Sequence, residues 1–158
     1  MPKGEIVLVL DNIRSLFNIG SMFRSADGFG VSKIYLCGIS GTPEQPKVLK
    51  VSLGAEQSVP WEKVGQAWRL VEKLKKQGYQ AVGLETAAGA VPLTTFEPKF
   101  PMALVVGNEV NGLSPAMMKR LDTIVRIPMY GVKESFNVGV ACGVALYHIS
   151  TRRQNGSK

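Results

Sequence analysis

The apolar residues of this chain follow two kinds of pattern: short continuous runs, and residues that recur at helical spacing. Residues 6–10 form a continuous apolar run, which predicts a strand buried on both faces of a sheet. Shorter runs of the same type predict four further strands: 33–36, 80–84, 102–106 and 123–127.

Between these runs, apolar residues recur at helical spacing. The clearest helix covers residues 64–77 and ends before Gly78. A single apolar stripe runs along it, formed by Ala67, Leu70, Val71 and Leu74. Capping residues and composition predict three more helices: 18–27, 114–120 and 137–151. Residues 47–56 fit neither pattern.

The predicted strands and helices alternate. This order indicates the α/β class, an open parallel sheet with helices on both faces. The chain is 45% apolar and 20% charged, as in ordinary globular proteins. We expect one domain over residues 1–153 and a polar, disordered tail at residues 154–158.

Several classes of protein are disfavoured by what the sequence lacks. No window approaches the ~20 apolar residues of a membrane span, and the first residues do not resemble a signal peptide. We therefore expect a cytoplasmic protein that binds no membrane. Cys37 and Cys142 lack metal-ligand spacing, and His148 is the only histidine. A reduced pair of thiols is expected, with no metal site and no catalytic triad unless His148 serves in one.

The formal net charge of +7 and the pI of about 9.6 favour a polyanionic partner. Much of the positive charge is spread along the chain, and basic residues on solvated helix faces commonly serve solubility alone. Charge by itself therefore leaves RNA or DNA binding and an ordinary solvated surface equally open.

Two glycine-containing loops follow predicted strands. They begin at Gly107 and near Gly131, at the carboxyl ends of two predicted strands. Open α/β sheets bind their ligands at this end of the strands. Glycine permits positive φ and close approach of backbone N–H groups to a ligand. Plain strand-to-helix turns have the same composition, so either loop taken singly could also be structural.

Asn18 and Arg24 lie on the first predicted helix, with Asn18 as its expected cap. An arginine near a helix N-terminus can bind phosphate, although a solvated surface arginine is the commoner case. The last predicted helix contains small residues from Ala141 to Ala145. They allow either tight packing on the sheet or a close helix contact between subunits, and we slightly favour the subunit contact.

Three motifs extend over almost the whole chain. They are Asn18-x-Gly20-x-x-x-Arg24, then Gly107-Asn108-Glu109 with Gly112-Leu113-Ser114, then Ile127-Pro128-Met129-x-Gly131 followed by Ser135-Phe136-Asn137-Val138. In these motifs, in this order, the chain resembles the SpoU/TrmH-type branch of the SPOUT RNA methyltransferases. Two positions depart from the family pattern: Phe136 stands where the family commonly has Leu, and Gly139 where it commonly has Ser.

The resemblance implies a C-terminal deep trefoil knot, a homodimer packed through the last helix, and S-adenosylmethionine as cofactor without any metal. It implies five catalytic positions: Asn18, Arg24, Glu109, Ser135 and Asn137. It also implies a set of cofactor-binding positions: Leu84, Glu85, Thr86, Gly107, Asn108, Ile127, Met129, Ser135 and Phe136.

The implied activity is methyl transfer to an RNA ribose 2′-hydroxyl, with tRNA as the expected substrate and rRNA as the alternative. A guanidinium keeps its proton at neutral pH, so we expect Arg24 to hold a phosphate and stabilise the developing alkoxide rather than act as the base. Two other functions remain as alternatives: a non-catalytic RNA-binding protein with a residual cofactor pocket, and a generic flavodoxin-like nucleotide binder. The matched catalytic positions disfavour the first, and Arg24 would be unnecessary in the second.

Overall fold

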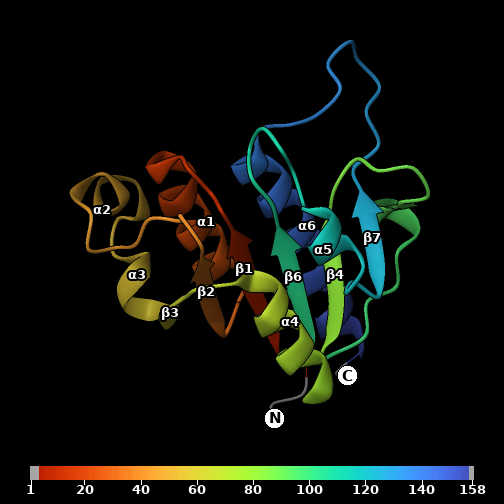
Figure 1. The fold of residues 1–158 in the computed structure, drawn as a ribbon, viewed down its shortest axis with the longest axis horizontal. Coiled ribbons are helices and arrows are strands. Elements are labelled where there is room, and N and C mark those ends of the chain that lie inside the picture. The colour runs from red at the N-terminus through yellow and green to blue at the C-terminus, as the bar shows by residue number, and fades with distance from the viewer. Residues whose placement is uncertain (1–3, 157–158) are drawn as a thin grey trace.

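The computed structural model describes the backbone of residues 4–156 and the side chains of residues 4–153. Within this range, parallel strands form one sheet in the order β3-β2-β1-β6-β4-β7-β5 (Figure 1). The strands are β1 (Ile6–Asp11), β2 (Lys33–Cys37), β3 (Trp61–Val64), β4 (Gln80–Leu84), β5 (Val91–Pro92), β6 (Met102–Val106) and β7 (Thr123–Arg126). The predicted α/β class and all five predicted strands are confirmed.

Helices cover both faces of this sheet (Figure 1). They are α1 (Leu16–Gly28), α2 (Pro46–Ser52), α3 (Ala55–Ser58), α4 (Ala67–Lys76), α5 (Pro115–Met118) and α6 (Val138–Gly156), with a short 3₁₀ turn, η1 (Leu93–Thr95).

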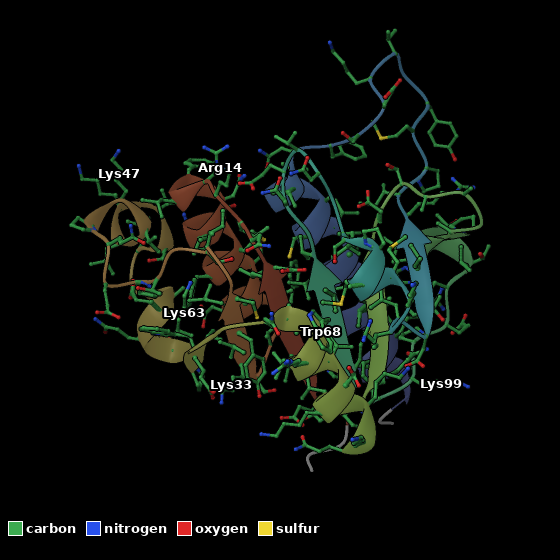
Figure 2. All side chains as sticks on the ribbon, viewed as in Figure 1. Arg14, Lys33, Lys47, Lys63, Trp68 and Lys99 are labelled. Atoms are coloured by element: carbon green, nitrogen blue, oxygen red, sulfur yellow. The ribbon has the colours of Figure 1, made fainter. Side chains whose placement is uncertain are left out.

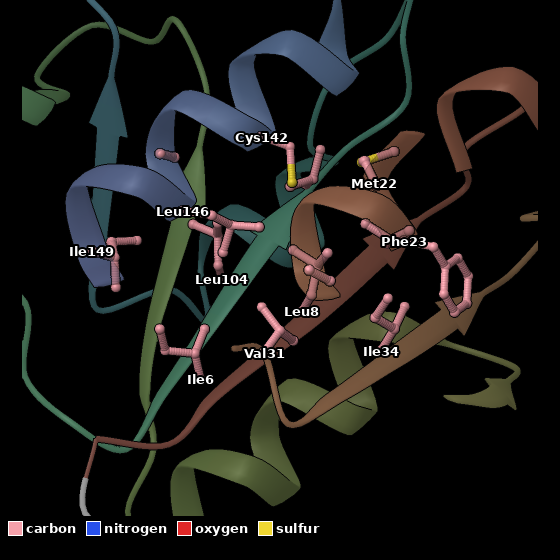
Figure 3. Packing of buried hydrophobic residues seen from close by; sticks show 14 of the residues in the cluster. Ile6, Leu8, Met22, Phe23, Val31, Ile34, Leu104, Cys142, Leu146 and Ile149 are labelled. Carbon is pink, nitrogen blue, oxygen red and sulfur yellow. The ribbon is translucent and has the colours of Figure 1, made fainter. Parts of the chain in front are cut away.

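The central strands β1 and β6 contribute side chains to a core on each face. Ile6 and Leu8 of β1 belong to the core beneath α1 and α6, while Val7 and Val9 belong to the core beneath α4. Figure 3 shows the first core, where Leu104 of β6 lies among side chains of α6. This division confirms that the apolar run at residues 6–10 is buried on both faces.

Two predicted helices begin in the wrong place. The helix predicted from residue 64 begins at Ala67, because Trp61–Val64 pairs with β2 as an edge strand. Asn18 is not the cap of α1. Ser15 takes that position, its Oγ accepting from the N–H of Asn18 at 3.1 Å, so the helix begins at Leu16.

Other boundaries also differ from the predictions. The ambiguous residues 47–56 belong to two helices, separated at Leu53 and Gly54, which have φ of 50° and 93°. The α5 helix ends at Met118, while α6 continues to Gly156, beyond the predicted residue 151. Residues 157 and 158 of the predicted tail lie outside the described residues, and the single-domain assignment for 1–153 stays a prediction.

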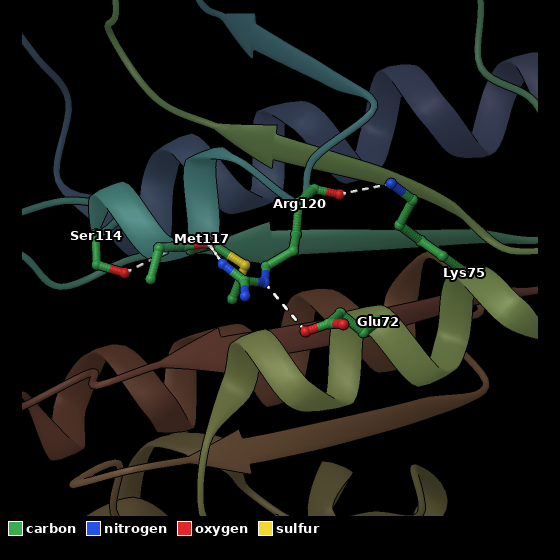
Figure 4. Close-up of polar contacts among 6 residues, drawn as sticks. Glu72, Lys75, Ser114, Met117 and Arg120 are labelled. Carbon is green, nitrogen blue, oxygen red and sulfur yellow. Dashed lines mark hydrogen bonds and ion pairs between the residues drawn. The ribbon is translucent and has the colours of Figure 1, made fainter.

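Polar contacts fasten the short α5 to α4. Arg120 Nε lies 3.2 Å from Glu72 Oε1, and Lys75 Nζ donates to the Arg120 carbonyl at 2.9 Å (Figure 4). Ser114 caps α5 by accepting from the N–H of Met117 at 3.2 Å. These contacts fix the end of the loop that begins at Gly107.

The small residues of α6 serve the protein's own core. Cys142 and Ala145 have no exposed surface and face the sheet, whereas Val140, Val144 and Tyr147 are exposed. The favoured assignment of the small residues to a subunit contact is therefore wrong for Cys142 and Ala145.

Both cysteines are free, as expected, and burial raises the pKa of the Cys142 thiol to about 12. Over residues 4–156 the helices are too short or too polar to cross a bilayer.

Candidate active site

A pocket of about 840 Å³ lies at the carboxyl ends of the strands. The loops after β4, β6 and β7 surround it, together with the start of α1 and the start of α6. The predicted site residues that line it are Asn18, Leu84, Glu85, Thr86, Gly107, Asn108, Glu109, Ile127, Met129, Ser135, Phe136 and Asn137. Arg24 is the predicted site residue that does not line it.

The Glu109 carboxylate joins the second motif to the first. It accepts from the backbone N–H groups of Arg14 at 2.9 Å and Ser15 at 2.7 Å, and from Asn18 Nδ2 at 3.3 Å. Partial burial by itself raises the pKa of Glu109, but these hydrogen bonds outweigh it and hold the pKa below the ordinary value. Glu109 is therefore ionised at neutral pH and accepts hydrogen bonds only.

Asn18 carries the connection to the third motif. Its side chain is 5% exposed, and its Oδ1 accepts from Asn137 Nδ2 at 3.2 Å. Asn137 Oδ1 in turn accepts from the N–H groups of Gly139 at 2.9 Å and Val140 at 3.2 Å, which caps the start of α6. One continuous chain of hydrogen bonds therefore links the β6–α5 loop, α1 and α6.

A second set of contacts holds the Gly107 loop against β4. Glu85 Oε2 accepts from the N–H of Leu113 at 2.9 Å. Gly112 has φ of 66°, and a Cβ added there would lie 2.0 Å from Glu85 Oε2. A Cβ at Gly107 would lie 2.6 Å from the Gly112 carbonyl carbon. Both glycines are thus required by the close packing of this loop.

The remaining walls are largely apolar. Leu84, Ile127, Met129 and Phe136 line the pocket, and Ser135 adds a hydroxyl. Such walls accept a flat, weakly polar ring, while backbone groups at the glycines can bind its polar edge. Among the described residues, no group of His, Cys, Asp and Glu side chains has a metal-binding arrangement.

The structure separates two arginines that the sequence does not distinguish. Arg24 is exposed on α1, outside the pocket. Arg14, which the sequence analysis missed, lines the pocket, and its guanidinium makes no hydrogen bond or ion pair within residues 4–153. Its place just after β1, at a strand's carboxyl end, could have identified it.

The fold and pocket define an α/β protein with a pocket framed by three loops at the carboxyl edge of a parallel sheet. The chain belongs to the family described as the SpoU rRNA Methylase family, whose model matches residues 5–147. The family resemblance drawn from the three motifs is thereby confirmed.

Curated relatives include enzymes with different RNA substrates. The 23S rRNA (guanosine-2′-O-)-methyltransferase RlmB of Coxiella burnetii is 32% identical over 149 residues, which cover 94% of this chain and 59% of that protein. The tRNA (guanosine(18)-2′-O)-methyltransferase of Aquifex aeolicus is 31% identical over 156 residues, covering 96% of this chain and 72% of that protein. The chain spans 59–60% of the length of several such relatives.

A solved structure with the same fold is the SpoU methyltransferase AviRb from Streptomyces viridochromogenes in complex with the cofactor AdoMet. The TM-score is 0.87 at 30% identity, covering 100% of this chain and 63% of that chain. The match in fold to SpoU and TrmH structures implies the C-terminal trefoil knot that the resemblance predicted.

Proposed function

We propose that this protein is an S-adenosylmethionine-dependent RNA ribose 2′-O-methyltransferase. The observation that carries the proposal is the hydrogen-bond chain from Glu109 through Asn18 to Asn137, which joins the three family motifs beside one pocket. Family membership, the named activities of the relatives and the AdoMet complex of AviRb support it.

The pocket residues fit this cofactor. The apolar side chains of Ile127, Met129 and Phe136 would hold the adenine ring, with backbone groups at Gly107 binding its edge. Glu85 has a carboxylate that can accept from ribose hydroxyls. When bound, the cofactor supplies an electrophilic methyl group on a sulfonium, so the chemistry needs no metal.

The protein's own residues would position the ribose hydroxyl and stabilise the charge that forms on it. Ser135 lies at the pocket and can hydrogen-bond the ribose. Asn18, Glu109 and Asn137 bind one another and would act as positioning residues that keep the loops in place. We propose that Arg24 binds the phosphate beside the target ribose and that Arg14 supplies a second positive charge at the pocket. The proton would leave to a phosphate oxygen or water.

We propose tRNA as the substrate, and the similarity to the 23S rRNA enzyme of Coxiella burnetii makes rRNA the second candidate. Basic side chains near the carboxyl edge of the sheet support an RNA partner. Figure 2 shows Arg14 and Lys47 along the same upper edge of the molecule. Both side chains are exposed, and cations so placed can bind the backbone of an RNA that reaches the pocket.

We further propose a cytoplasmic homodimer in which α6 packs against a second copy. Val140, Val144 and Tyr147 are 53%, 40% and 61% exposed on one side of α6, and Phe17 of α1 is 62% exposed. Apolar side chains gathered on neighbouring helices favour an interface over contact with water.

The test is calorimetry with S-adenosylmethionine in the presence of a chelator, followed by labelled-methyl transfer to bulk tRNA and rRNA. Nucleoside mass spectrometry identifies the product. We expect cofactor binding without metal and label in 2′-O-methyl nucleosides of tRNA. Label mainly in rRNA would support the second substrate. Absence of both binding and transfer at millimolar cofactor would reject the enzyme.

A further inference from the structure

A second pocket of about 700 Å³ borders the loop that begins at Gly107. It shares Arg14, Asn108, Val110 and Gly112 with the first pocket, so the two sites adjoin. Asp11, Asn12, Ile39 and Asn111 belong to the second pocket only. Its volume is within the range of about 300–1,000 Å³ for small-molecule sites.

Two exposed apolar side chains form walls of this pocket. Ile39 is 63% exposed and Val110 is 82% exposed. Their backbones are held by hydrogen bonds: Asn12 Oδ1 accepts from the N–H of Ile39 at 2.9 Å, and Asn108 Oδ1 accepts from the N–H of Val110 at 2.9 Å. Asn108 Nδ2 also donates to the Asn12 carbonyl at 2.8 Å, which ties the two walls together. The pocket thus offers preformed apolar surfaces.

Three polar side chains of the pocket, those of Asp11, Arg14 and Asn111, are free to bind a ligand within the part of the chain whose side chains are described. The half-buried Asp11 carboxylate has no hydrogen bond or ion pair within residues 4–153, and burial raises its pKa. The guanidinium of Arg14 and the amide of Asn111 likewise make no side-chain bond there. A half-buried carboxylate without donors is costly unless a ligand supplies them.

We propose that this second pocket binds a guanine base of the RNA substrate, next to the nucleotide whose ribose enters the first pocket. The inference rests on the proposed function. Guanine presents N1–H and the exocyclic amino group side by side, and a carboxylate can accept both at once. Ile39 and Val110 would contact the faces of the ring, and Arg14 would bind the phosphate between the two nucleotides. Unstacked bases are commonly recognised in this way by RNA-binding proteins.

The test uses the full chain labelled with ¹⁵N and saturated with S-adenosylhomocysteine to fill the first pocket. Guanosine 5′-monophosphate and uridine 5′-monophosphate are titrated separately, and amide shifts are followed by NMR. We expect guanosine monophosphate to shift the amides of Ile39 and Asn111 and to bind at least about tenfold more tightly than uridine monophosphate, because uracil has a single ring N–H between two acceptors.

Asp11→Asn should weaken guanosine monophosphate binding by about tenfold or more and leave S-adenosylhomocysteine affinity unchanged. The matched control is Asp27→Asn, which removes the same charge from an exposed site on α1 outside both pockets. Ile39→Ser removes one apolar wall without altering the carboxylate. It should also weaken guanosine monophosphate alone, which covers the case that Asp11→Asn does not fold.

Three results would overturn the proposal: shifts confined to the first pocket, equal binding of the two mononucleotides, or an equal effect of Asp27→Asn. Weaker S-adenosylhomocysteine binding in folded Asp11→Asn would instead assign Asp11 to the cofactor, which also rejects the guanine site. These binding measurements do not depend on methyl transfer. A protein that binds S-adenosylhomocysteine but transfers no methyl group would reject the proposed activity, and the guanine site would still be decided by the binding results.

Discussion

The side-chain amide of Asn18 on α1 donates to the carboxylate of Glu109 at 3.3 Å, although 91 residues separate them in the chain. Glu109 also accepts from two backbone N–H groups just before α1, so its charge holds the whole start of that helix. Asn18 continues the connection to Asn137 and α6. Residues that look like separate catalytic groups in the sequence therefore form one supporting unit beside the pocket.

Replacing Asn18 should disturb all three loops. Asn18→Ala leaves Asn137 Nδ2 and one Glu109 oxygen without this partner, at a site where Asn18 itself is buried. We expect a loss of about 1–3 kcal/mol in unfolding free energy and weaker cofactor binding. Urea unfolding and calorimetry measure the two effects. Asn111→Ala removes an exposed amide and should change stability by less than about 0.5 kcal/mol. Equal stability of the two variants would contradict the supporting role.

Gly112 offers a test of the loop that lines the proposed cofactor pocket. Gly112→Ala places a Cβ where Glu85 Oε2 now lies, whereas Gly89→Ala, also at positive φ, meets no atom within 4 Å. Both variants bear the backbone strain of about 1 kcal/mol that a Cβ adds at positive φ. We expect Gly112→Ala alone to lower cofactor affinity, by at least about tenfold, because Glu85 and the loop must move apart. Calorimetry with both variants would decide this, and similar affinities would reject it.

Glu109 should make stability depend on pH. Its folded-state pKa lies below the ordinary value, so its contribution is fully present above the unfolded-state pKa of about 4.3 and is lost as pH falls through the folded-state pKa. Glu109→Gln should therefore be less stable than the unmodified protein near pH 6, and the two should converge toward pH 3. The difference should be small, about 1 kcal/mol, because the side chain is exposed. A constant difference in thermal unfolding across this range would exclude the ionic contribution.

The local pattern of apolar residues predicts most of the fold but not the hydrogen-bond chain beside the pocket. The strands β1 and β6 can be recognised in the sequence because residues 6–10 and 102–106 are apolar throughout. The edge strand β3 was missed, since its four residues include exposed Glu62 and Lys63 and only pairing with β2 makes it a strand. The motifs identified most of the pocket, whereas the Glu109–Asn18–Asn137 chain joins residues about 90 or more positions apart and depends on the folded arrangement.

The proposed subunit contact can be tested on the outer side of α6. Val144 is 40% exposed, so Val144→Arg should leave the core intact and convert a dimer to a monomer. Ala145 has no exposed surface, and an arginine there would disrupt the protein's own core. Leu53→Arg, at a 67% exposed apolar residue after α2, is the control and should leave the mass unchanged. Light scattering gives the masses, and a monomer for the unmodified protein at micromolar concentration would refute the dimer.

Arg24 is the sharpest test of the catalytic assignment, because it is exposed and lies outside the pocket. If Arg24 is only a solvated side chain, Arg24→Ala should change stability by less than about 0.5 kcal/mol and leave methyl transfer intact. If it binds the phosphate and stabilises the alkoxide, turnover should fall roughly a hundredfold or more, with cofactor affinity unchanged.

Two further variants define the role of Arg24. Arg24→Lys keeps the charge but loses the planar fork, so partial recovery indicates an electrostatic role and little recovery indicates bidentate phosphate binding. Arg69→Ala, at an exposed arginine on α4, controls for the loss of a positive charge. Labelled-methyl transfer to tRNA and rRNA is measured beside cofactor binding for each variant. Full activity of Arg24→Ala would remove Arg24 from the site and leave Arg14, which lines the pocket, as the cation to test next.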